Sequence, residues 1–238
     1  MTPPWCCCLS AKSFLSLLQF SDGLFPAGAY AHSFGLEYYV QCGKVRDADG
    51  VCKFIRANLE GSVAPTDAVA MLTALRGVLG NLDLASLLVL DQQLEAMKSV
   101  EELRSASRQM GRQMIRIAAE LTHHRLLQSY FQATESDSAP GHHAVCFGAI
   151  GGTQGWSEPD AVCAFLFSAI SAMVGAALRL LPLGQMRGQR ILWEMKPTLE
   201  RLAQESMAKE VSEMWSFVPG LEIASMRHAQ LDARLFRS

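Results

Sequence analysis

The chain has 238 residues, of which 50% are hydrophobic and 18% are charged. This balance excludes extensive intrinsic disorder, and the length suits one large domain or two small ones. Lysine and arginine number 21 against 23 aspartates and glutamates, so the net charge of −2 argues against a general nucleic-acid binder.

The first part of the chain predicts two short helices separated by a bend. The spacing of Phe14, Leu17 and Leu18 indicates the first helix. The stretch LFPAGAYAHS follows, and Pro26 and Gly28 prevent a regular helix from continuing through it. A second helix is expected directly after this bend.

Signals for helix starts recur along the rest of the chain. They are side chains that can cap a first turn, or a proline that can begin one. The predicted starts lie at Phe34 with His32 or Ser33 as its cap, after Asp47 or Asp49, at Pro65, after Asn81 and after Ser99.

The second half continues the helical pattern with one clear interruption. A long pattern runs from Ser99 to about Tyr130, and the polar stretch 133–141 then predicts a loop. Further helical patterns cover 142–150, 159–180 and 184–205, whereas 207–220 is ambiguous. With no long run of alternating β-branched residues, we predict an all-α fold, a single-domain helical bundle of about nine or ten helices.

One segment needs a check for membrane insertion. Residues 161–178, AVCAFLFSAISAMVGAAL, carry no charge, which reaches the lower length limit for a spanning helix. Its many alanines, two serines and lack of a flanking basic cluster weaken that interpretation. We therefore expect a buried central helix, and a membrane anchor stays open as an alternative that cell fractionation would decide.

The cysteines and histidines were considered as metal ligands and nucleophiles. The seven cysteines lack the regular spacing of a disulfide framework, and three of them, Cys6, Cys7 and Cys8, are adjacent. This pattern indicates a reducing, cytoplasmic compartment. His142 and Cys146 stand four residues apart and provide two metal ligands at most. We expect no metal site and no catalytic residue, and a small helical enzyme using His142, His143 and Cys146 is the alternative.

An arginine stripe occupies the middle of the chain. Arg104, Arg108, Arg112 and Arg116 recur every four residues and therefore share one face of the predicted helix. Like charges at this spacing repel by a few tenths of a kcal/mol per pair. Either an acidic partner or intramolecular carboxylates such as Glu101 must offset that repulsion.

Both ends of the chain contain unusual segments. FPAGAYAHSFGLE, residues 25–37, is either a tight packing corner or a recognition surface presenting Tyr30 and His32. SMRHAQLDARLFRS, residues 225–238, is amphipathic and basic, so it suits docking on its own domain or in a groove of a partner.

Five segments in this order resemble the family of the urease accessory protein UreF. They are FPAGAYAHSFGLE, EELRSASRQMGRQ, HHAVCFG, RLLPLGQMRGQ and SMRHAQLDARLFRS. The resemblance implies an all-helical, cytoplasmic homodimer without enzymatic activity. It also implies binding to UreD, called UreH in some species, and recruitment of the GTPase UreG, so that nickel is inserted into apo-urease. Nickel is then only in transit within the complex, and no cofactor, nucleic acid or membrane is expected.

The resemblance also assigns domains and partner-binding residues. It implies a variable or disordered segment over 1–8, an all-helical UreF-like domain over 9–220 and a partner-binding tail over 221–238. Ala229 stands where the family would carry a glutamate. The resemblance suggests partner-binding roles for Tyr30, His32, Ser33, Arg227, His228 and Arg234. From the arginine stripe we add Arg104, Arg108 and Arg112 as residues expected to bind partners.

Overall fold

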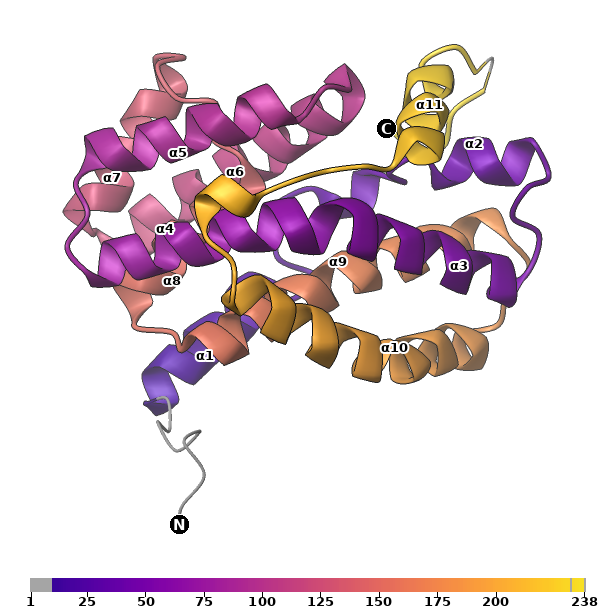
Figure 1. Ribbon diagram of the computed structural model, residues 1–238, viewed down its shortest axis with the longest axis horizontal. Helices are drawn as coiled ribbons and strands as arrows, with labels where there is room; N and C mark the ends of the chain where they lie inside the picture. Colours follow the sequence, from indigo (N-terminus) through magenta and orange to yellow (C-terminus); the bar gives the residue numbers. More distant parts are fainter. Residues whose placement is uncertain (1–9, 232, 238) are drawn as a thin grey trace.

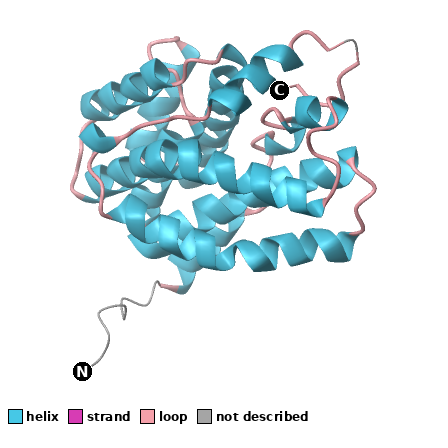
Figure 2. Cartoon of the chain, turned by 45° about the vertical axis from the view of Figure 1, so that its right-hand side comes forward, coloured by secondary structure: helices cyan, strands magenta, loops and turns pink. Residues whose placement is uncertain are grey.

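The computed structural model describes residues 10–231 and 233–237, and within them it contains helices and loops but no strand (Figure 1; Figure 2). The all-α prediction is therefore confirmed. The expected N-terminal segment 1–8, with its three cysteines, lies outside the described residues. The α-helices are α1 (Ala11–Ser21), α2 (Leu36–Gln41), α3 (Ala48–Asn58), α4 (Val69–Leu79), α5 (Leu84–Met97), α6 (Glu101–Thr122), α7 (Arg125–Glu135), α8 (His143–Gln154), α9 (Glu158–Leu180), α10 (Gln185–Met207) and α11 (Pro219–His228). Two short 3-10 turns, η1 (Ala29–Ala31) and η3 (Val211–Glu213), complete the fold together with a π-helical stretch, η2 (Leu59–Ala68).

Helices α3 and α4 are parts of one continuous rod, because η2 joins them without a break. Counted as one helix, the rod brings the number in the described part of the chain to ten. Pro65 lies inside η2, so the prediction that it opens a helix was wrong. Proline lacks an N–H and cannot continue the regular α-helical ladder, and the wider π turn accommodates it.

Residues 214–218, which we call the strap, donate two backbone hydrogen bonds to carbonyl groups of η2. The Phe217 N–H donates to the Gly61 carbonyl at 2.8 Å, and the Trp215 N–H donates to the Pro65 carbonyl at 3.3 Å. Figure 1 shows this segment running along the rod on its way to α11.

The core centres on α8, which packs against α4 along a face of small residues. A Cβ at Gly148 would collide with the Met71 carbonyl, and one at Gly152 would lie 2.5 Å from the Val78 Cβ. Glycine at these two positions therefore allows the two helix backbones to approach closely. At the end of α8, the rings of Phe147 and Trp156 pack 4.9 Å apart, and both side chains are buried.

Helix α9 contains the segment that raised the membrane question. Among the described helices it is the one long and apolar enough to cross a bilayer, and half of its most apolar window is buried within the fold. Its inner face, including Phe165, Leu166 and Ile170, belongs to the core cluster. This burial favours a helix of the bundle over a membrane anchor.

Three local predictions about helix ends were wrong. Asn81 adopts a positive φ of 65° and Asp83 caps α5 instead, accepting a hydrogen bond from Ser86 N at 2.9 Å. Helix α6 begins after Val100 without a side-chain cap, so the expected capping box at Ser99 is absent. The long pattern to Tyr130 is interrupted at His123, whose φ of 52° separates α6 from α7.

Candidate functional site

The N-terminal bend is held in an unusual backbone conformation. Gly28, Phe34 and Gly35 have positive φ values of 91°, 54° and 85°. A bulky residue such as Phe34 rarely adopts this conformation, and such strain is concentrated at functional sites. The bend leaves Tyr30 69% exposed while His32 and Ser33 are buried.

Gly35, rather than the predicted His32 or Ser33, is the N-cap residue of α2, although the Ser33 hydroxyl accepts a hydrogen bond from the Glu37 N–H in the first turn at 3.4 Å. Gly35 also allows α2 to approach α11 closely. A Cβ there would lie 3.0 Å from Ser225 Oγ and 3.4 Å from the Leu221 carbonyl oxygen. The start of the chain is thereby packed against its end.

Glu37 lies at the centre of this contact. Its carboxylate is on α2, and the residue is only 2% exposed. It accepts hydrogen bonds from His228 Nε2 at 2.8 Å, from the Leu235 N–H at 2.7 Å and from the Phe236 N–H at 3.1 Å. A single buried carboxylate therefore fixes both α11 and the chain that follows it.

A second carboxylate lies on the other side of the histidine. Glu102 Oε2 on α6 is 3.4 Å from His228 Nδ1, and Glu102 Oε1 is 4.0 Å from an Arg234 guanidinium nitrogen. The residue after the histidine, Ala229, cannot form an ion pair. The structure supplies the charged partners of His228 from α2 and α6 instead.

Arg179, at the end of α9, joins the bend to the last residues of the tail. Its guanidinium lies 3.7 Å from the centroid of the Tyr30 ring and 4.1 Å from that of Phe236, which are cation–π distances. It also donates to the Tyr30 carbonyl at 2.7 Å. The Arg237 N–H donates to the Ala31 carbonyl at 2.8 Å, which closes the contact.

The structure thus brings together the two groups of residues that the sequence analysis treated separately. The bend exposes Tyr30, α11 exposes Arg227 and the chain after it exposes Arg234, and these segments are joined through the buried Glu37 and His228 into one continuous surface. We call this surface the bend–tail surface. Burial and then the nearby Arg237 lower the pKa of His32 to about 4, so the His32 imidazole beneath this surface is neutral at neutral pH.

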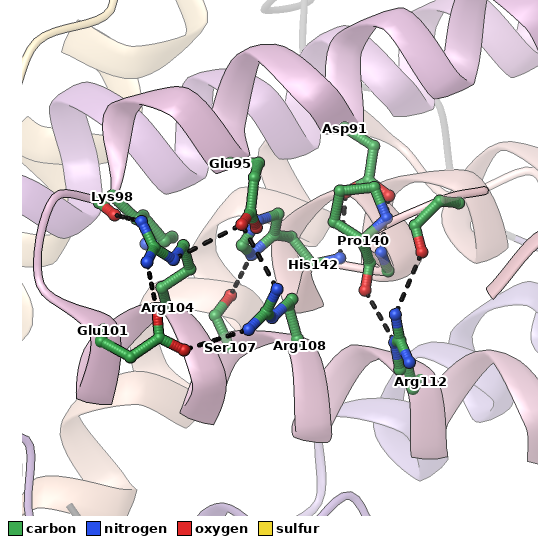
Figure 3. A network of polar contacts seen from close by, with 12 residues as sticks. Asp91, Glu95, Lys98, Glu101, Arg104, Ser107, Arg108, Arg112, Pro140 and His142 are labelled. Carbon is green, nitrogen blue, oxygen red and sulfur yellow. Dashed lines mark hydrogen bonds and ion pairs between the residues drawn. The ribbon is translucent and has the colours of Figure 1, made fainter. Parts of the chain in front are cut away.

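The arginine stripe does not join the bend–tail surface, and Figure 3 shows the polar contacts that hold its first three members. Arg104 and Arg108 both form ion pairs with Glu95 of α5 and Glu101 of α6. Arg112 pairs with Asp137 at 2.8 Å and donates to a backbone carbonyl of the loop before α8. Intramolecular carboxylates therefore offset the repulsion of the stripe, and partner binding by these arginines stays a prediction.

His142 completes the same network (Figure 3). Burial, then Lys98 and the nearby arginines, lower its pKa to about 3. The neutral ring is therefore assigned one proton, on Nε2, which donates to Glu95 at 2.8 Å, while Nδ1 accepts from the Ser107 hydroxyl at 3.1 Å. Asp91 accepts the backbone N–H groups of residues 141 and 142. These contacts tie α5, α6 and the start of α8 together.

The side chains of His142, His143 and Cys146 do not converge on one site. His143 stacks against Phe165, with ring centroids 5.4 Å apart, and burial lowers its pKa to about 4. Burial raises the pKa of the Cys146 thiol well above its usual value, so this cysteine is not an activated nucleophile. Within residues 10–231 and 233–237, no group of three or more metal-ligating side chains is positioned to hold an ion.

Comparison with known proteins adds independent information. The family profile described as UreF matches residues 45–196. A urease accessory protein UreF from Bacillus sp. (strain TB-90) is 34% identical over 224 residues, which cover 94% of this chain and 98% of the relative. The chain belongs to the UreF family.

Two further UreF relatives extend the match over the whole length. The urease accessory protein UreF of Trichodesmium erythraeum (strain IMS101) is 32% identical over 93% of this chain and 95% of its own length. That of Paenarthrobacter aurescens (strain TC1) is 32% identical over 97% of this chain and all of its own. Membership of the UreF family supports a role in urease maturation, and the description as accessory proteins implies that this role is not catalytic.

Sequence reasoning identified most of the bend–tail surface but missed Glu37, Glu102 and Arg179. Glu37 was visible as the last residue of the FGLE motif that closes the bend. No feature of the sequence placed it opposite a histidine 191 positions further along the chain. Arg179 was part of the RLLPLGQMRGQ motif, yet nothing in that motif indicated stacking on Tyr30.

Proposed function

We propose that this UreF-family chain is a non-catalytic scaffold in urease maturation. Its bend–tail surface binds UreD (UreH), and the resulting assembly recruits the GTPase UreG and inserts nickel into apo-urease. The observation that supports this most directly is that Tyr30, Arg227 and Arg234 are exposed on segments that the buried Glu37 holds together. Tyrosine and arginine are the residue types that most often dominate binding energy at protein interfaces.

The rigidity of this surface supports the same proposal. Three hydrogen bonds to Glu37 and the stacking of Arg179 hold the tail in place before any partner arrives. Less conformational entropy is then lost on binding, so more of the contact energy contributes to affinity.

The remaining parts of the proposal follow from the family role. We propose that the chain acts as a cytoplasmic homodimer without a resident cofactor. Nickel is the cargo of the complex, while nucleic acid and membranes are not partners. The alternative of a small enzyme using His142, His143 and Cys146 gains no support, because their side chains make separate contacts with different neighbours.

Point substitutions on the exposed residues test the proposal. Deletion of the tail is less informative, since Leu221 and Phe236 belong to the hydrophobic core. We expect Tyr30→Ala/Arg234→Glu to abolish co-purification with UreD while the far-UV circular dichroism spectrum stays unchanged. The matched control is Trp193→Ala/Arg190→Glu, which alters an equally exposed aromatic residue and an arginine on α10.

Two results would count against the proposal. One is that the Tyr30/Arg234 variant still co-purifies with UreD at the wild-type yield. The other is that the control variant loses UreD to the same extent, since this would show that surface charge rather than the bend–tail surface determines binding.

A further inference from the structure

A second surface feature lies where α2 and α3 meet the strap and the start of α11. It is a groove of about 430 Å³ whose floor is apolar. Tyr39, Phe54, Val218 and Leu221 line it, and the Tyr39 and Phe54 rings meet edge to face at 5.6 Å. None of these residues belongs to the exposed part of the bend–tail surface.

One rim of the groove is formed by the strap and is held rigidly. Besides the backbone hydrogen bonds to η2, the Ser216 hydroxyl donates to Ser62 Oγ at 3.2 Å. Gly61 is needed for this arrangement, because a Cβ there would lie 2.5 Å from Val218 Cγ1. The strap thereby presents Phe217, which is 73% exposed, at the edge of the groove.

The groove carries positive charge. Lys44 and Lys53 line it, and no aspartate or glutamate is among its lining residues. Both lysines are exposed, and neither forms an ion pair with any residue that the structure describes. On the same rod, Asp49 pairs with Arg187 and Glu60 pairs with Arg201.

We propose that this groove binds a segment of a partner protein in which an apolar or aromatic side chain is flanked by carboxylates. The apolar floor and Phe217 accommodate the central side chain, and Lys44 and Lys53 pair with the acids on either side of it. The inference rests on the scaffold function proposed above and adds a second docking surface, separate from the bend–tail surface, with a stated partner chemistry.

A model peptide tests the chemistry directly. The probe is fluorescein-labelled Glu-Glu-Phe-Glu-Glu, and fluorescence anisotropy measures its binding to the full chain. We expect saturable binding that weakens as salt is added, and binding at least about tenfold weaker to Lys44→Glu/Lys53→Glu. The control Lys12→Glu/Lys196→Glu makes the same change of charge on α1 and α10. It also matches in removing one lysine that lies over an aromatic ring: Lys44 lies 5.4 Å from the Tyr39 ring centroid, and Lys196 lies 3.9 Å from the Trp193 ring centroid.

Peptide variants separate the apolar and charged contributions. Gln-Gln-Phe-Gln-Gln and Glu-Glu-Ala-Glu-Glu should each bind more weakly than the probe. The inference is overturned if the wild-type chain does not bind the probe, or if the Lys44/Lys53 variant binds the probe as tightly as wild type does. It is equally overturned if both peptide variants bind the wild-type chain as tightly as the probe does. It is also overturned if a thymidine oligonucleotide displaces the probe, since aromatic and lysine side chains together also bind single strands.

Assembly in cells distinguishes this inference from the scaffold proposal. The chain and its variants are co-expressed with UreD and UreG from the same organism, and the complexes are isolated. Failure of the wild-type chain to assemble with UreD and UreG refutes the scaffold proposal, whereas the peptide-binding result for the groove remains valid. Assembly of wild type and of the Lys44/Lys53 variant in equal yield refutes the groove as a docking surface, whereas loss of one partner from that variant alone supports it.

Discussion

Replacing Glu37 with glutamine should release the tail without unfolding the bundle. The two carboxylate oxygens of Glu37 accept three hydrogen bonds, from His228 Nε2 and from the backbone N–H groups of Leu235 and Phe236. A glutamine has only one acceptor oxygen, so at least one donor loses its partner and faces an NH₂ group instead.

The size of the effect follows from these contacts. A hydrogen bond to a charged group contributes about 1.5–3 kcal/mol, and a buried donor left without a partner costs about 1–3 kcal/mol. We therefore expect Glu37→Gln to lower the free energy of tail opening by roughly 3 kcal/mol. Since about 1.4 kcal/mol corresponds to a factor of ten, amide hydrogen exchange in the tail should accelerate by about a hundredfold.

Hydrogen exchange read by mass spectrometry checks this prediction on peptides that cover 229–237. Glu120→Gln is the control, because Glu120 is exposed on α6 and forms no ion pair with any described residue. Exchange in α4 and α8 should stay at the wild-type rate in both variants. Wild-type protection of the tail in Glu37→Gln would refute the role assigned to this carboxylate.

Three further predictions concern the bundle itself. Gly148→Ala should destabilise the fold by about 3 kcal/mol or more in urea denaturation, whereas Gly175→Ala, with open space around its Cβ, should be neutral or slightly stabilising. Arg108→Glu should lower the melting temperature by several degrees, because Arg108 forms ion pairs with Glu95 and Glu101 of the same chain, whereas Arg116→Glu on the same helix should not. Equal effects of the two substitutions would contradict the stabilising role assigned to these ion pairs. The pKa of His142 is about 3 in the folded state, against 6.5 for an exposed histidine. Its contribution to the free energy of unfolding is therefore fully present above pH 6.5 and is lost as the pH falls toward 3, by up to about 1.4 kcal/mol per pH unit. His142→Gln should reduce this slope in denaturation curves at pH 7, 6 and 5, and an unchanged slope would exclude His142 as its source.

The sequence predicted the elements whose signals are local. Residues 159–180 were expected to be helical, and α9 begins one residue earlier because Ser157 caps it by accepting from Asp160 N. The sequence offered Asp47 or Asp49 as the cap of α3, and Asp47 fills that position by accepting from Gly50 N. The unusual composition of the bend and tail singled them out, and the structure packs these two segments against each other.

Features that depend on distant contacts were not predictable in this way. A proline at position 65 signals a helix start in isolation, whereas in the fold it lies inside a π-helical stretch whose carbonyls accept hydrogen bonds from the distant strap. The sequence left open whether carboxylates or a partner offset the arginine stripe. The decisive carboxylate, Glu95, lies on another helix, and Asp137 lies in a loop. The position of Glu37 opposite His228 follows from tertiary packing and leaves no periodic pattern to detect.

The strap has a consequence for the order of events during synthesis. Its partners in η2 emerge from the ribosome long before residues 214–218, so the Gly61 and Pro65 carbonyls cannot accept hydrogen bonds from the strap until that segment has been made. The strap forms one rim of the groove, and the chain that follows it packs on Glu37 beneath the bend–tail surface. Both surfaces assigned to partners therefore form only after residues 214–237 have been made, although most of the helices that support them are made earlier.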